Sequence, residues 1–140
     1  MTDAEEFDWH ALRIMCINND QEFRHLITGL LRDLGVGSTP MAKNGDDGYY
    51  EIENSSVDMV ILDSKLDGGD GLDFVRKLRN PASTPSAHIP IIMMSTERSL
   101  EVVTYAIKQG VDHYMVKPVT QKDLGVSIKN MLLKPPQKIK

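Results

Sequence analysis

The sequence predicts an α/β domain built on a five-stranded parallel sheet with helices on both faces. Short, continuous apolar runs alternate with segments whose apolar residues recur every three or four positions. Each apolar run ends abruptly in polar residues, as buried strands do at the edge of a parallel sheet. The chain of 140 residues, 41% hydrophobic, is long enough for one core and too short for two ordinary domains.

Five strand–helix units follow one another along the chain. The run "RIMCIN" is the first strand, and the helix after it stops at Gly35. A weak strand near 39–43 precedes a short helix around 46–53, which Gly48 weakens. The remaining strands are "VDMVILD", "IPIIMMS" and "HYMVK". Apolar periodicity predicts helices over 72–78, 100–107 and 124–132, the second closed by Gly110, with a loop over 80–88.

Composition narrows the function classes. The net charge of -4 argues against a nucleic-acid surface, which needs clustered Lys and Arg. Apolar runs of four or five residues are too short to span a membrane, and the acidic N-terminus is unlike a secretory signal peptide. The single cysteine, Cys16, lies inside an apolar run and is interpreted as core filler rather than a reactive thiol. These features predict a cytoplasmic protein that binds neither nucleic acid nor membrane.

Polar side chains follow four of the five predicted strands. In open parallel sheets, ligands bind beyond the carboxyl ends of the strands, so these side chains are expected to converge. A carboxylate can accept a phosphoryl group, oxygen ligands can hold Mg²⁺, and a lysine and a hydroxyl can bind phosphoryl oxygens. The residues concerned are Asn18, Asn19, Asp20, Asp63, Ser95, Thr96 and Lys117.

Three motifs, "VILDSKLDGGDGLDFVRKLR", "IPIIMMSTE" and "GVDHYMVKPVT", make residues 11–133 resemble a response-regulator receiver domain of two-component signalling. The resemblance implies a flavodoxin-like, doubly wound sheet with strand order 2-1-3-4-5. It implies a stand-alone, chemotaxis-type switch in a phosphorelay rather than an enzyme. A sensor histidine kinase or phosphotransfer protein would supply the phosphoryl group, and a downstream protein would bind the face of the fourth helix, fifth strand and fifth helix. Residues 1–10 would be an N-terminal extension and 134–140 a basic tail.

The same resemblance assigns roles within the site. Asp63 is the implied phosphoacceptor, and Ser95, Thr96 and Lys117 are the implied phosphoryl-binding groups. Tyr114 matches the aromatic residue that changes rotamer on phosphorylation, although a half-buried strand aromatic needs no such role. The Lys117–Pro118 bond matches a position that is usually cis in the family.

The sequence departs from the family at its acidic pair, where it has Asn18 and Asn19. The implied Mg²⁺ ligands are Asn19, Asp63 and the backbone carbonyl of Lys65, with Asn18 binding weakly or through water. Asp20 is interpreted as a helix cap. Because amides carry no charge, we expect weak Mg²⁺ binding, slow or absent phosphorylation of Asp63, and a pocket that is well formed when empty.

Other departures lie around the pocket. The resemblance places Lys65 and Glu97 at its entrance, where they would form either an exposed ion pair or two separately solvated side chains. Asp67 stands where the family usually has proline, and "DGGDG" is interpreted as a turn because it lacks the spacing of a calcium loop. Exposed candidates for the output face are Thr104, Tyr105, Lys108 and Gln109.

Two alternative functions use the same fold. The Asn pair favours a pseudo-receiver whose partner binding is independent of phosphorylation, whereas the retained Asp63, Ser95 and Lys117 oppose it. A flavodoxin-like enzyme or FMN carrier would need a phosphate-cradling loop after the first strand. The segment "NNDQEF" contains no Gly, Ser or Thr, which disfavours this class.

Overall fold

The computed structural model describes residues 7–66, 69–80 and 85–133, and the centre of the fold is a five-stranded parallel sheet. Counted along the chain, its strands confirm the predicted order 2-1-3-4-5, and every neighbouring pair is parallel. In spatial order they are β2 (Met41–Ala42), β1 (Ile14–Ile17), β3 (Met59–Asp63), β6 (Ile91–Ser95) and β7 (His113–Val116).

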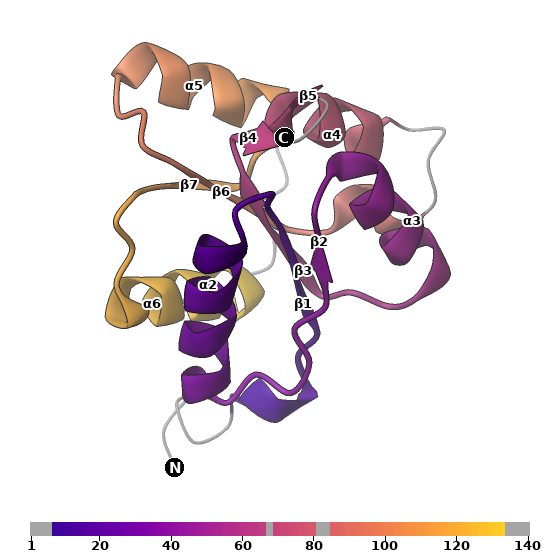
Figure 1. The fold of residues 1–140 in the computed structure, drawn as a ribbon, viewed down its shortest axis with the longest axis vertical. Helices are drawn as coiled ribbons and strands as arrows, with labels where there is room; N and C mark the ends of the chain where they lie inside the picture. Colours follow the sequence, from indigo (N-terminus) through magenta and orange to yellow (C-terminus); the bar gives the residue numbers. More distant parts are fainter. Residues whose placement is uncertain (1–6, 67–68, 81–84, 134–140) are drawn as a thin grey trace.

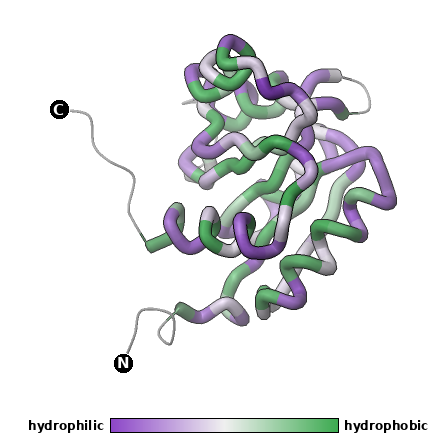
Figure 2. The backbone as a smooth tube through the Cα atoms, turned by 90° about the vertical axis from the view of Figure 1, so that its left-hand side faces the viewer, coloured by the Kyte–Doolittle hydropathy of each residue, from purple (hydrophilic) through white to green (hydrophobic). Residues whose placement is uncertain are grey.

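Helices cover both faces of this sheet (Figure 1). One face packs against α2 (Gln21–Leu34) and α6 (Gln121–Leu133), the other against α3 (Gly45–Asn54), α4 (Gly71–Arg79) and α5 (Leu100–Gln109). The interior strands β1, β3 and β6 are buried along their whole length, so they form a continuous apolar layer between helices of mixed hydropathy (Figure 2). Burial on both sides explains why their sequences do not alternate.

The helix ends follow the local signals of the sequence. Asp20 caps α2, because its carboxylate accepts the backbone N–H groups of Glu22 and Phe23. Gly35 ends the same helix with φ at 105°, and Gly110 ends α5 with φ at 121°. Both angles lie in the left-handed region that favours glycine. The interpretation of Asp20 as a cap is therefore confirmed.

Three segments add detail that periodicity does not predict. The short strands β4 (Lys65–Leu66) and β5 (Gly69–Asp70) pair antiparallel, so part of "DGGDG" forms one short strand, while Asp67 and Gly68 lie outside the described residues. The predicted loop over 80–88 contains a 3-10 helix, Pro85–His88. A further 3-10 helix, Trp9–Ala11, lies before β1.

The segment before β1 packs onto the domain. The rings of Phe7 and Trp9 meet edge to face with centroids 4.6 Å apart, and both contact the core beneath α2 and α6. Lys129 of α6 lies over the Phe7 ring, 5.8 Å from its centroid. Phe7 and Trp9 of the predicted extension thus contact the core of the domain, whereas residues 1–6 and the tail over 134–140 lie outside the described residues.

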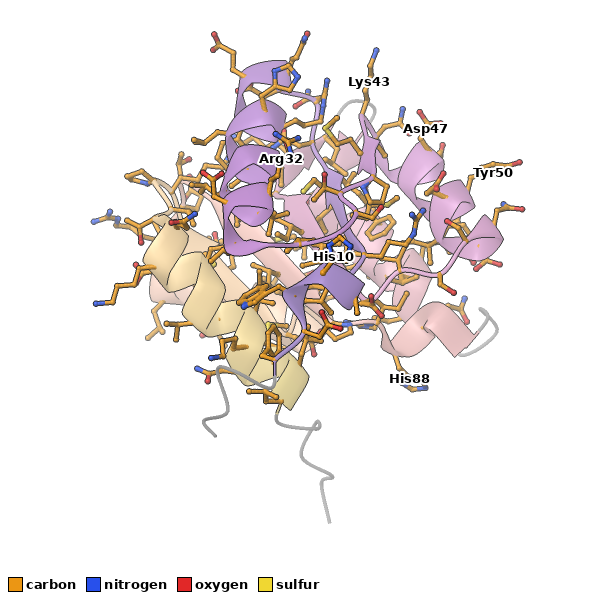
Figure 3. All side chains as sticks on the ribbon, turned by 90° about the horizontal axis from the view of Figure 1, so that it is seen from below. His10, Arg32, Lys43, Asp47, Tyr50 and His88 are labelled. Atoms are coloured by element: carbon orange, nitrogen blue, oxygen red, sulfur yellow. The ribbon has the colours of Figure 1, made fainter. Side chains whose placement is uncertain are left out.

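The position of the single cysteine agrees with its interpretation as core filler. Cys16 is buried in β1, and burial raises the pKa of its thiol to about 12, so the group stays protonated at neutral pH. Seen from below, Lys43, Tyr50 and His88 point away from the body of the protein (Figure 3). None of the helices in the described part of the chain has the length and apolar character needed to cross a membrane.

His113 makes stability depend on pH. It is half-buried on β7, with Nε2 3.1 Å from the Ser127 hydroxyl, and burial lowers its pKa below that of an exposed histidine. The unfolded chain therefore binds a proton more readily than the folded one, so this contribution to stability is complete above the unfolded pKa of about 6.5. It is lost as pH falls below that value and through the lower pKa of the folded state. Urea unfolding between about pH 7.5 and 5.5 should show falling stability. His113→Gln should flatten that slope, and an unchanged slope would contradict the assignment.

Candidate functional site

Asp63 lies at the carboxyl edge of the sheet and is held from three sides. Its Oδ2 accepts the Lys117 ammonium at 2.8 Å and the Asn18 amide at 3.0 Å, while its Oδ1 accepts the backbone N–H of Lys65 at 3.3 Å. Asp63 is the last residue of β3, and Asn18 follows β1, its direct neighbour in the sheet. The predicted convergence of Asp63, Asn18 and Lys117 is therefore present.

Asn18 is buried, with 4% of its surface exposed, and both ends of its amide are engaged. Its Nδ2 donates to Asp63, and its Oδ1 accepts the backbone N–H of Asp20 at 2.6 Å. This second contact fixes the orientation of the amide, because the reverse orientation would set two donors against each other. Asn18 thus presents a hydrogen-bond donor to Asp63, where a carboxylate would present a second negative charge.

Two residues on α2 that sequence reasoning did not identify support this arrangement. The Phe23 ring lies beneath the Lys117 ammonium, 4.0 Å from it, in a cation–π contact that helps to fix the lysine. Arg24 donates from its guanidinium to the backbone carbonyl of Asn18. Neither residue belongs to a motif of the resemblance. Only the turn between β1 and α2 brings them to the site.

Ser95 and Tyr114 both bind the backbone of Glu97. The Ser95 hydroxyl accepts the Glu97 N–H at 3.0 Å, and the Tyr114 hydroxyl donates to the Glu97 carbonyl at 2.8 Å. Ser95 also shares a 3.0 Å hydroxyl–hydroxyl bond with Ser64, a residue that sequence reasoning missed. Ser64, Ser95, Glu97 and Tyr114 line one cavity of about 580 Å³ between α4 and α5.

The residues present offer few free, charged oxygen ligands to a magnesium ion. Mg²⁺ prefers several free oxygen ligands in octahedral geometry, usually with one or two carboxylates. Here both oxygens of Asp63 already accept hydrogen bonds, and the Asn18 oxygen is turned to the backbone of Asp20. Within the described residues, no group of three or more His, Cys, Asp or Glu side chains could hold a metal ion.

The other predicted site residues lie around this centre. Asn19 and Thr96 are exposed beside it, and the Lys117–Pro118 bond is cis, as the resemblance implies. Lys65 and Glu97 both line the 580 Å³ cavity, yet the ion pairs of the described chain do not include a pair between them. The two side chains are therefore solvated separately, the second of the two predicted arrangements.

One prediction about the surface is wrong. Thr104, Tyr105 and Lys108 on α5 are exposed, but Gln109 is half-buried and accepts a hydrogen bond from Arg76 at 3.2 Å. Gln109 is the last residue of α5, where the chain turns toward α4, so helical periodicity alone does not describe its surroundings.

Comparisons with known proteins identify the family of the chain. The family model for the response regulator receiver domain matches residues 14–129. Chemotaxis protein CheY1 of Helicobacter pylori is 30% identical over 86% of this chain and 97% of its own length. Chemotaxis protein CheY-3 of Vibrio cholerae is 29% identical over 81% of this chain and 85% of its own.

Solved structures share the fold. A two-component response regulator from Clostridium difficile matches with a TM-score of 0.79 and 25% identity, covering 88% of this chain and 97% of its own. The receiver domain of a Pseudomonas aeruginosa sensor histidine kinase, which holds a magnesium ion in its active-site cleft, matches with a TM-score of 0.79 and 20% identity over 88% and 98% of the two chains. With a matching family model, a common fold and a converging strand-end site, the chain belongs to the response regulator receiver domain family.

Proposed function

We propose that this receiver, spanning residues 11–133, is a phosphorylation-controlled protein–protein switch in which Asp63 is the phosphoacceptor. The observation that carries the proposal is the 2.8 Å ion pair between Asp63 and Lys117 at the carboxyl edge of the sheet. Lys117 compensates the charge of the unmodified Asp63 carboxylate and can bind a phosphoryl oxygen once Asp63 is phosphorylated. Ser95 and Thr96 supply the hydroxyl groups next to it.

Phosphoryl transfer would use the freer oxygen of Asp63. Its Oδ2 accepts two hydrogen bonds, whereas its Oδ1 accepts one, at 3.3 Å, from the described residues. We assign Oδ1 as the nucleophile. It forms a bond to the phosphorus of a phosphohistidine or an acyl phosphate, and the bond to the donor breaks with its electron pair leaving on the donor. Water later attacks the phosphorus of the aspartyl phosphate, which releases inorganic phosphate and restores the Asp63 carboxylate.

We propose that the site binds Mg²⁺ weakly. When bound, the ion would neutralise charge on the phosphoryl group, and Asn19, Asp63 and the Lys65 carbonyl are the residues that would hold it. The engaged Asn18 amide and the single carboxylate of the pocket provide less negative charge than a cation site ordinarily has.

The proposed partners follow from the family. Receivers are signalling switches rather than classical enzymes, and they exchange phosphoryl groups with histidine kinases or phosphotransfer proteins. We propose the face of α5, β7 and α6 as the output surface, where Thr104, Tyr105 and Lys108 are exposed. The proposed location is the cytoplasm, where the kinases of such relays present their phosphohistidine.

One observation favours a pseudo-receiver as the second candidate. Asn18 and Lys117 already satisfy Oδ2 of Asp63, which reduces the gain from binding a cation or a phosphoryl donor. In that case a partner would bind the protein in the same way with or without a phosphoryl group on Asp63.

Intact-mass measurement after incubation with acetyl phosphate and Mg²⁺ separates the two candidates. We expect a slow gain of one phosphoryl group by the wild type and none by Asp63→Asn, which keeps the shape of the side chain but removes the nucleophile. A wild type that stays unmodified at every donor concentration would reject the switch and leave the pseudo-receiver.

Calorimetric titration tests the charge of the pocket. The wild type should bind Mg²⁺ weakly, and Asn19→Asp should bind it about tenfold more tightly, because divalent affinity rises with ligand charge. Tight binding by the wild type, with no gain in the variant, would show that the amides do not limit cation binding.

A further inference from the structure

Ser64 follows Asp63 in the sequence, but its side chain contacts the end of the neighbouring strand, β6. Its hydroxyl lies 3.0 Å from that of Ser95, which ends β6 and is 2% exposed. The bonds to Asp63 come from Asn18, Lys117 and Lys65, and Ser95 is not among these donors in the described part of the chain. Ser95 is thus bound to Ser64, not to the carboxylate beside it.

The main chain of Ser64 is fixed, so its hydroxyl can change position mainly by rotation of the side chain. Its N–H donates to the Met94 carbonyl at 3.1 Å, and its carbonyl accepts the N–H of Gly71 at 2.9 Å. A side chain on Gly71 would collide with the carbonyl of Asp63, so the start of α4 lies directly on this peptide. Such close packing leaves rotation about χ1 as the main motion open to Ser64.

Ser95 is held from two sides as a result. One bond comes from Ser64, and the other comes from the N–H of Glu97, whose carbonyl accepts Tyr114. If Ser95 turned toward a phosphoryl group on Asp63, it would leave both partners. The N–H of Glu97 would then lose its acceptor. Glu97 is also the residue whose carbonyl accepts the Tyr114 hydroxyl.

We propose that Ser64 is a positioning residue of the switch, whose hydroxyl holds Ser95 in the rotamer bound to Glu97 and away from Asp63. This rests on the proposed function of Asp63 and Ser95. A single hydrogen bond of this kind shifts an equilibrium between two rotamers by about fivefold. Ser64 therefore sets how readily Ser95 is released, and through Glu97 it links that release to Tyr114.

Two variants isolate the hydroxyl. Ser64→Ala removes it, and Ser64→Thr keeps it as the matched control. Hydrogen exchange of the Glu97 amide, measured by NMR in the unphosphorylated protein, reports whether Ser95 still accepts that N–H. We expect exchange about fivefold faster in Ser64→Ala and unchanged in Ser64→Thr. Equal exchange in all three proteins would overturn the proposal, whatever the state of Asp63.

The functional step has a separate readout. With acetyl phosphate and Mg²⁺, Ser64→Ala should reach a higher phosphorylated fraction than the wild type, because Ser95 is free to bind the phosphoryl group, and Ser64→Thr should match the wild type. Faster exchange with unchanged phosphorylation in Ser64→Ala would overturn the positioning role. Faster exchange, with no phosphorylation of any of the three proteins, would support the Ser64–Ser95 contact and instead reject Asp63 as a phosphoacceptor.

Discussion

An Asn18→Asp protein should unfold at a lower temperature than the wild type in the absence of metal and should recover that loss when Mg²⁺ is added. The substitution removes the donor that Asn18 presents to Asp63 at 3.0 Å and places a second carboxylate in the same buried position. Two carboxylates at that distance repel each other, and a buried acceptor is left without its donor. We expect a cost of about 1–3 kcal/mol in the free energy of unfolding.

Mg²⁺ should reverse this cost because the same carboxylate becomes a charged ligand. A cation that binds only the folded state stabilises that state. The gain in stability rises with the logarithm of the ratio of cation concentration to dissociation constant. Thermal unfolding with and without Mg²⁺ measures both effects. Asn130→Asp, an equal change of charge on an exposed part of α6, is the matched control and should show neither. If Asn18→Asp is as stable as the wild type without Mg²⁺, the hydrogen bond from Asn18 to Asp63 does not stabilise the pocket.

The fold could be predicted from sequence because its signals are local and repeated. Buried strands read as continuous apolar runs, and Asp20, Gly35 and Gly110 mark helix ends through their own backbone contacts. Gly48 shows where such reasoning stops. It was expected only to weaken α3, but a side chain there would collide with Ile17, so the glycine permits close approach of α3 to β1. Packing between elements is not visible in local sequence.

The sequence could predict which residues come together in the site, but not which hydrogen bonds join them. Strand ends place Asp63 and Lys117 together, whatever the details of their rotamers. The orientation of the Asn18 amide depends on the Asp20 N–H, and the Ser64–Ser95 bond depends on which rotamer each hydroxyl side chain adopts. Phe23 contributes its ring face to Lys117 only after α2 has docked. Such contacts are set by tertiary packing, so periodicity and motifs do not report them.

Arg79 is a clear example of a residue that sequence reasoning passed over. It looks like an ordinary charged residue at the end of α4, yet its partners are mostly backbone carbonyls from later segments of the chain. Its Nη1 donates to the carbonyls of Ala87 and Ile89, each at 2.7 Å, and its Nε donates to Gly110 at 3.0 Å. Its Nη2 binds the Asp112 carboxylate at 2.7 Å. Burial lowers the pKa of the guanidinium, and the carboxylate of Asp112 acts in the opposite direction.

Arg79→Met should therefore be one of the most destabilising single changes at a charged position of this chain. Methionine keeps the apolar stem that packs against Gly110, but it leaves three carbonyls and one carboxylate without the donor that joins α4 to the segment before β6 and to the turn before β7. The Arg79 side chain is 20% exposed, so water replaces these bonds only in part. We expect a loss of about 2–4 kcal/mol in the free energy of unfolding, measured by urea denaturation.

Two further variants show whether the loss of stability comes from the geometry of the Arg79 guanidinium or from its charge alone. Arg79→Lys keeps the charge but cannot reach four acceptors at once, so it should recover less than half of the loss. Arg76→Met removes an exposed guanidinium three residues earlier on the same helix and should change stability little. If Arg79→Lys were as stable as the wild type, the Coulombic attraction to Asp112 would account for the contribution of Arg79. Equal losses in Arg76→Met and Arg79→Met would instead show that the backbone-carbonyl contacts of Arg79 add nothing to stability, because the bonds of Arg76 go to side chains.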